Sequence, residues 1–145
     1  MTREVVTLAY RAPELLFEAI FYGGSVDTWA VGCMFGELML RHPLFPGTSA
    51  LDQLAKIFNV LGTPSAANWP NHDVLPACIE FEARAPLRLQ DIFSSASGDA
   101  LDLLRGLLTL DPRRRISAAD ALKHPYFSAA PAPTKPAQLP RPEGK

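Results

Sequence analysis

The sequence lacks an excess of basic residues. Its 145 residues include 14 Lys or Arg and 15 Asp or Glu, which gives a net charge of −1. A protein that binds nucleic acid through phosphate contacts needs a surplus of cations, so we expect no direct binding of nucleic acid. No apolar run approaches the ~20 residues of a membrane-spanning helix. Residues 1–4 do not lead into the apolar core of a signal peptide, so we expect an intracellular protein without membrane contact.

Cysteine and histidine are also scarce. Cys33 lies inside an apolar run and Cys78 lies in a proline-containing loop, a distribution typical of reduced, structural thiols. The three histidines have no cysteine or carboxylate at metal-ligand spacing, so we expect them to be surface or packing residues and not metal ligands: His42, His72 and His124.

No segment alternates convincingly between apolar and polar residues, so the pattern predicts a mainly α fold. Between Asp27 and Arg41 the only charged residue is Glu37, and Ser25 is a suitable N-cap. A helix that is apolar all round is buried all round, so residues 26–41 should form a central buried helix. Amphipathic helices are expected around it, at residues 50–61, 98–110 and 117–123.

Two segments are rich in proline. Residues 63–97 contain four prolines and no clear helical pattern, and such long connections are usually functional or partner-binding. Residues 129–145 contain five prolines and few large apolar side chains, which predicts an extended tail.

The most informative stretch is residues 5–16, V-V-T-L-A-Y-R-A-P-E-L-L. Pro13 suits the first position of a helix, and Glu14 follows it at the positive end of the helix dipole. A charge between apolar runs is either solvated or held by a partner from elsewhere in the chain. A candidate partner lies about a hundred residues on, in the sequence D-P-R-R-R-I at residues 111–116.

These residues resemble the end of the activation segment of a eukaryotic protein kinase, which closes with A-P-E. The remaining matches place the resemblance among the cyclin-dependent kinases, and most closely with the catalytic subunit of the cyclin-dependent-kinase-activating kinase. They are V-D-T-W-A-V-G-C at 26–33, L-F-P-G at 44–47, D-Q-L at 52–54, L-G-T-P at 61–64, W-P at 69–70, D-P-R-R-R-I at 111–116, Y-F-S at 126–128 and Q-L-P-R-P at 138–142.

The resemblance implies the C-terminal half of the large lobe of a kinase, with a partial kinase domain at residues 1–128 and a Pro-rich tail at 129–145. It implies a serine/threonine kinase that uses ATP and Mg²⁺ and acts in the nucleus or cytoplasm. Its protein substrates would be cyclin-dependent kinases and the RNA polymerase II tail, and its partners a cyclin H-like subunit and an assembly factor.

The catalytic elements of a kinase are absent from the sequence. It contains no Gly-rich loop, no H-R-D with its downstream Asn and no D-F-G, and D-I-F at residues 91–93 lacks the glycine. Phosphoryl transfer depends on positioning and charge stabilisation by these parts. We therefore expect no catalytic residue, no bound cofactor and no activity in this chain alone. The alternative is a non-catalytic module that docks substrates or partners.

The resemblance assigns roles to three residues near the N-terminus. Thr2 corresponds to the phospho-acceptor of the activation loop. Val6 corresponds to the residue that shapes the pocket for a proline after the target Ser or Thr, and Thr7 to a hydroxyl that contacts the catalytic Asp and Lys. Ala9 departs from the usual Trp, and we expect residues 1–10 to be loosely held.

Three further residues have structural roles in the family. Glu14 and Arg115 correspond to a buried ion pair, predicted to be bidentate, and the alternative is two solvated charges. Asp27 corresponds to an anchor of the catalytic-loop backbone, and without that loop we expect it to be more exposed than in a whole kinase. Arg113 and Arg114 should face solvent.

The helices that would cover part of residues 26–41 in a kinase are missing, which predicts an exposed apolar patch.

Overall fold

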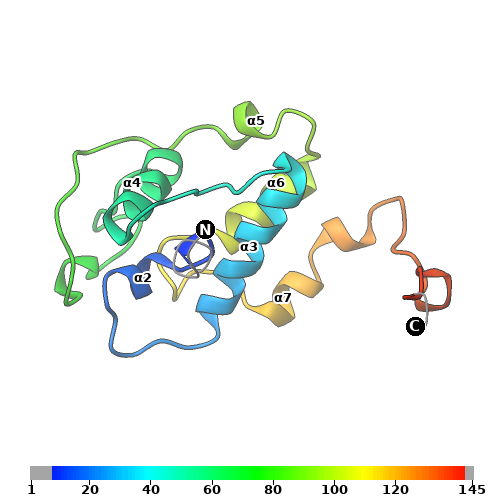
Figure 1. Cartoon of the computed structure of the whole chain (residues 1–145), viewed down its shortest axis with the longest axis horizontal. Helices are drawn as coiled ribbons and strands as arrows, with labels where there is room; N and C mark the ends of the chain where they lie inside the picture. Colours follow the sequence, from blue (N-terminus) through cyan, green and yellow to red (C-terminus); the bar gives the residue numbers. More distant parts are fainter. Residues whose placement is uncertain (1–7, 143–145) are drawn as a thin grey trace.

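The computed structural model describes residues 8–142, and within that range it contains helices and no strands, so the predicted mainly α fold is confirmed (Figure 1). None of these helices is long and apolar enough to cross a membrane. The elements are α2 (Pro13–Leu16), α3 (Ser25–Leu40), α4 (Ala50–Leu61), α5 (Leu89–Ile92), α6 (Gly98–Leu107) and α7 (Ala118–Leu122), with short 3-10 turns η1 (His72–Val74), η2 (Pro125–Ser128) and η3 (Pro136–Gln138).

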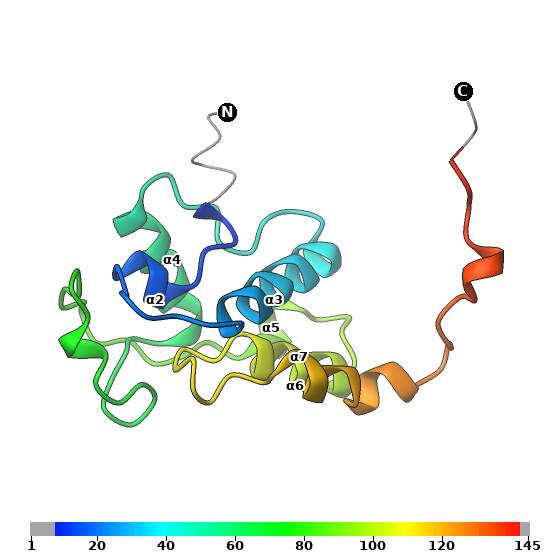
Figure 2. The same ribbon diagram turned by 90° about the horizontal axis from the view of Figure 1, so that it is seen from below.

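Helix α3 is the central element, and it packs closely against α6 (Figures 1 and 2). The close approach depends on Gly32, because a Cβ there would lie 2.9 Å from the Cβ of Leu107. Trp29 and Cys33 are buried, but Leu38 is 78% exposed. The prediction that this helix is buried all round is therefore wrong for one face. The expected exposed apolar patch is present there, at Val31, Met34 and Leu38.

Serine side chains begin three of the helices. The hydroxyl oxygens of Ser49, Ser97 and Ser117 each accept a hydrogen bond from the backbone N–H three residues on, at 3.1 Å. These bonds satisfy donors that the first helical turn leaves free. The expectation for Ser25 is wrong: Gly24 is the N-cap, in a right-handed helical conformation, and Ser25 is the first helical residue.

The long segment of residues 63–97 contributes to the core and also lies on the surface. Trp69 is 4% exposed and lies 5.8 Å, ring centre to ring centre, from Phe17. Phe81 meets Phe58 edge-on at 4.9 Å. By contrast, residues 129–142 extend away from the helices (Figure 2).

A buried glutamine fixes the loop before α4. Gln53 has no exposed surface, and its Oε1 accepts a hydrogen bond from the backbone N–H of Gly47 at 2.8 Å. A Cβ on Gly47 would lie 2.6 Å from the Cα of Gln53, closer than packed atoms can approach. The loop of residues 41–49 therefore requires glycine at position 47 for space.

We predict that Gly47→Ala destabilises the protein, because the added methyl group must push the loop away from α4. Overpacking of this kind costs about 1–3 kcal/mol. The control is Gly98→Ala, since a Cβ at position 98 has no neighbour within 4 Å. Urea unfolding followed by circular dichroism measures both variants. Equal stability of the two variants would show that the contact between Gly47 and Gln53 does not constrain the loop.

Candidate functional site

The A-P-E segment forms the short helix α2, and its carboxylate points into the protein. Ala12 is the N-cap in extended conformation, and Pro13 opens the helix. Glu14 is 3% exposed even though it is charged. A buried carboxylate needs a compensating charge and hydrogen bonds, since burial without them is costly.

Arg115 supplies that charge in the predicted bidentate geometry. Its Nη1 donates to Glu14 Oε1 at 2.7 Å, and its Nη2 donates to Glu14 Oε2 at 3.0 Å. Neither side chain has more than 3% of its surface exposed. The structure thus joins two residues that lie 101 positions apart, and the alternative of two solvated charges is excluded.

The other three N–H groups of Arg115 bind backbone carbonyls. Nη1 donates to Ser25 O at 2.7 Å, Nε donates to Thr109 O at 2.9 Å, and Nη2 donates to Leu110 O at 3.2 Å. All five donors of the guanidinium are therefore used. The group also lies 5.0 Å from the ring centre of Trp29. One side chain thereby connects α2, the start of α3 and the turn after α6.

Asp111 shapes the turn that carries Arg115. It is 1% exposed, and its Oδ1 accepts a hydrogen bond from the backbone N–H of Arg113 at 3.0 Å. The side chains of Arg113 and Arg114 are exposed, but they also donate to carbonyls of the long segment, at Pro70 and Ala67. These two arginines therefore hold residues 67–70 against this turn. The expectation that they face solvent did not include this role.

Of the remaining candidate residues the structure describes only Asp27, whose side chain has no bond to this pair. Asp27 is exposed at the start of α3, and among the described residues its side chain has no hydrogen-bond or ion-pair partner. Thr2, Val6 and Thr7 lie outside the described residues. The structure therefore assembles the anchor of the A-P-E segment and leaves the three proposed substrate-side residues undescribed.

The residues just before α2 are held more firmly than expected. Tyr10 donates a hydrogen bond to Glu37 Oε2 at 2.5 Å, and Ala9 is 9% exposed. The bond to Glu37, together with burial, raises the pKa of Tyr10. The expectation of loose packing is thus wrong for residues 8–10. That expectation did not consider that Glu37, near the C-terminal end of α3, is available as an acceptor.

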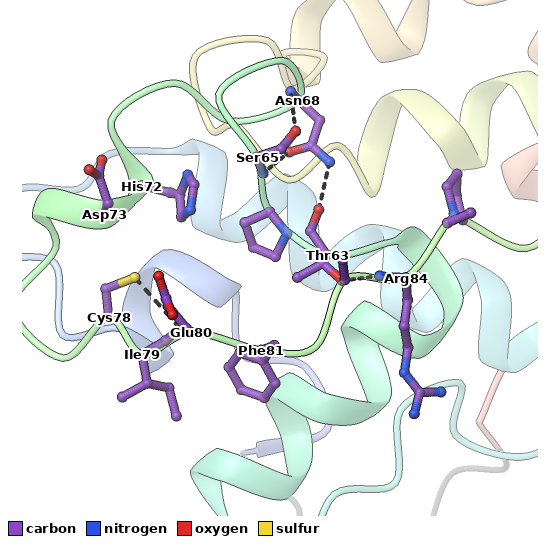
Figure 3. Close-up of a pocket in the computed structure, with 14 residues that line it drawn as sticks. Thr63, Ser65, Asn68, His72, Asp73, Cys78, Ile79, Glu80, Phe81 and Arg84 are labelled. Atoms are coloured by element: carbon purple, nitrogen blue, oxygen red, sulfur yellow. Dashed lines mark hydrogen bonds between the residues drawn. The ribbon is translucent and has the colours of Figure 1, made fainter.

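A concave region lies along the segment of residues 63–97 (Figure 3). It encloses about 900 Å³ and includes Cys78, Asp73 and Glu80. Burial, followed by the two nearby carboxylates, raises the pKa of the Cys78 thiol. Asn68 donates to Thr63 O at 3.0 Å and braces the entrance of the segment. In the described part of the chain no group of three potential ligands could hold a metal ion.

We predict that Arg115→Met lowers the free energy of unfolding by about 3–5 kcal/mol, because it leaves the carboxylate of Glu14 buried without a partner. Arg115→Lys should fall between this variant and the wild type, since one ammonium group cannot replace five planar donors. The matched control is Arg114→Met in the same turn, where the side chain is 57% exposed and the expected loss is about 1 kcal/mol or less. Chemical denaturation measures all three. Similar losses for Arg114→Met and Arg115→Met would contradict the importance of the buried pair.

We also predict that the two thiols differ in reactivity. Burial raises the pKa of Cys33 to about 12, although Arg115 partly opposes the shift. At pH 8 roughly one Cys33 thiol in 10⁴ is then ionised, and the thiolate is the reactive form. Iodoacetamide should label the partly exposed Cys78 in the native protein and Cys33 only after unfolding. Mass spectrometry of the Cys78→Ser variant isolates Cys33, and fast native labelling of that variant would refute the prediction.

Comparison with known proteins extends these observations to almost the whole chain. A profile of the family described as "Protein kinase domain" matches residues 1–127. The chain is 51% identical over 144 residues to cyclin-dependent kinase D-1 of Oryza sativa subsp. indica, covering 99% of this chain and 34% of that protein. It is 51% identical over 142 residues to cyclin-dependent kinase 7 of Dictyostelium discoideum, covering 98% and 39%.

A third relative is a probable serine/threonine-protein kinase KIN28 homolog of Encephalitozoon cuniculi, 51% identical over 140 residues, covering 97% of this chain and 46% of that protein. The chain spans between a third and a half of the length of these relatives. Its helices match the mainly α C-terminal part of a kinase large lobe. The chain therefore belongs to the protein kinase domain family and resembles kinases of the cyclin-dependent-kinase-activating type.

Proposed function

We propose that this chain is the substrate-side scaffold of a cyclin-dependent serine/threonine kinase. The observation that carries the proposal is the buried, fully bonded Arg115, which fixes the A-P-E helix through Glu14. In the family this helix ends the segment on which a protein substrate rests. A scaffold of this kind holds its segment through buried charge and needs no nucleotide to do so.

The whole kinase would transfer the γ-phosphate of ATP, with Mg²⁺, to Ser or Thr in a protein, often before Pro. Its substrates would be cyclin-dependent kinases and the RNA polymerase II tail. A cyclin H-like subunit and an assembly factor would be its partners, in the nucleus or the cytoplasm. These proposals follow from the relatives that the chain resembles, of which it spans less than half.

The proposed roles of single residues follow the same correspondence. Thr2 would accept the activating phosphate, whose charge of about −1.5 to −2 requires arginines to hold it. Val6 and Thr7 would position the substrate, and Asp27 would anchor the backbone of a catalytic loop. The partial kinase domain would end at residue 128, before the extended tail.

The 145-residue chain by itself is proposed to be inactive. The sequence lacks the motifs whose lysine and aspartates hold ATP and Mg²⁺. It also lacks the H-R-D motif that supplies the catalytic base. A second candidate function is therefore a docking module that offers a substrate-binding face without transferring phosphate. The ordered A-P-E helix favours this candidate, because it persists without the catalytic elements.

We predict that the purified chain neither binds nor uses ATP. Millimolar Mg-ATP should leave its melting temperature unchanged, because only a ligand that binds the folded state raises stability. Incubation with labelled ATP and a Ser-Pro peptide should give no more product than an Ala-Pro peptide, with a full-length cyclin-dependent kinase as positive control. Phosphate transfer would overturn the proposed inactivity. If the chain also inhibits the positive control and Arg115→Met does not, the docking function is supported over a scaffold that is only structural.

A further inference from the structure

Residues 131–142, here called the proline segment, follow a repeat of three residues that the proposed function does not use. A polyproline II helix has three residues per turn, so residues three apart lie on the same edge. In that conformation the first edge carries three prolines and a leucine: Pro133, Pro136, Leu139 and Pro142. The second edge carries two prolines and two small residues: Pro131, Thr134, Ala137 and Pro140.

The third edge of the proline segment is polar and basic. It carries Lys135, Gln138 and Arg141, with Ala132 before them, and the segment contains no acidic residue. The two bases lie two turns apart, about 19 Å along a polyproline II helix. The repeat therefore places the prolines on two neighbouring edges and the positive charge on the third. This arrangement is complementary to a groove with an apolar floor and an acidic rim.

The tail that contains the proline segment has polyproline II backbone angles at three positions. The φ and ψ angles are −73° and 151° at Ala129, −62° and 141° at Lys135, and −71° and 143° at Leu139. Every residue from 129 to 142 is exposed, and the tail extends away from the helices (Figure 2). It begins after residue 127, where the match to the kinase domain family ends. The proline segment thus lies beyond the part of the chain that matches the domain.

The short turn η3 interrupts the polyproline II conformation. Two backbone hydrogen bonds close it: Gln138 N–H donates to Lys135 O at 2.8 Å, and Leu139 N–H donates to Pro136 O at 3.3 Å. Both bonds lie in an exposed segment, so water can replace them when the turn opens, and the net cost of losing them is small. Opening of η3 lines up the prolines that precede and follow it.

We propose that the proline segment is the ligand of an SH3-type domain whose groove is lined by aromatic side chains and rimmed by carboxylates. Proline-rich segments dock in such grooves as a polyproline II helix, which is preformed and loses little entropy on binding. The edge of Pro133 and Pro136 packs against the aromatic rings. The long side chains of Lys135 and Arg141 reach the carboxylates of the rim. The proposal does not rest on the proposed function, because it uses no residue of the kinase-like part.

The composition of the segment favours this partner over two others. A nucleic acid requires more phosphate contacts than Lys135 and Arg141 can make. A membrane surface requires large apolar or aromatic anchors, and Leu139 is the only large apolar side chain in the segment. By contrast, a Pro-x-x-Pro spacing at Pro133 and Pro136 with bases nearby supplies both features that an acidic-rimmed SH3 groove recognises.

Titration of the 145-residue chain against purified SH3 domains tests the class of partner. The probes are SH3 domains whose grooves are rimmed by Asp or Glu, and WW domains serve for comparison. At least one of these SH3 domains should bind, and the double variant Pro133→Ala/Pro136→Ala should raise its dissociation constant by about tenfold or more. Lys135→Glu/Arg141→Glu should have a similar effect, and added salt should weaken binding by the wild type. Binding by none of the SH3 domains at about 200 μM, or by WW domains alone, overturns the proposal.

A variant of unchanged composition and charge tests the spacing. Lys135→Pro/Pro136→Lys exchanges two neighbours and leaves no two prolines three residues apart, so it should bind as weakly as Pro133→Ala/Pro136→Ala. The matched control is Gln138→Ala on the third edge, which should change the dissociation constant less than about threefold. Circular dichroism should show the same helix content for every variant. If the exchange variant binds as well as the wild type, the spacing is not recognised and the proposal fails.

NMR spectra of the ¹⁵N-labelled chain locate the contact. Addition of the SH3 domain should shift the amide signals of Lys135, Leu139 and Arg141 and leave those of α3 unchanged. Shifts confined to the helices, with the signals of the proline segment unchanged, would place the contact elsewhere and contradict the proposal.

Discussion

The buried contact between Glu14 and Arg115 constrains the rest of the structure. Neither charge could remain inside the protein alone, so the two segments that carry them must stay together. The guanidinium then requires three more acceptors, and it finds them in the backbone at Ser25, Thr109 and Leu110. A buried pair of this kind adds little net stability compared with apolar side chains of the same size. Its main effect is to specify position, because planar donors tolerate few other arrangements.

The sequence predicted the ion pair of Glu14 and Arg115 but not the backbone carbonyls that also bind the guanidinium. Glu14 was recognisable because a charge between apolar runs needs a partner, and the family resemblance supplied Arg115. The carbonyl acceptors have no side-chain signature, so no residue pattern could reveal them. Gln53 was missed because a polar residue on an amphipathic helix is expected at the surface, whereas it is fully buried and binds the loop before α4. Ser25 suits an N-cap by residue type, but it is already the first helical residue and Gly24 is the cap.

The central helix shows a second limit of sequence patterns. A helix with apolar residues on all sides predicts burial, and the pattern cannot say which side is covered within a given chain. Only the structure separates the covered face of Trp29 and Cys33 from the exposed face of Leu38.

The anchor and the exposed face are coupled through the geometry of α3. Arg115 holds the carbonyl of Ser25 and stacks on Trp29, so it fixes the first turn of the helix and its rotation. At ~100° per residue Trp29 lies about 200° from Asp27, on the opposite side of the helix. The interaction that fixes the A-P-E helix therefore also directs the side chains of Val31, Met34 and Leu38 away from the core. If the rotation of α3 were free, these apolar side chains could turn inward and would not remain on the surface.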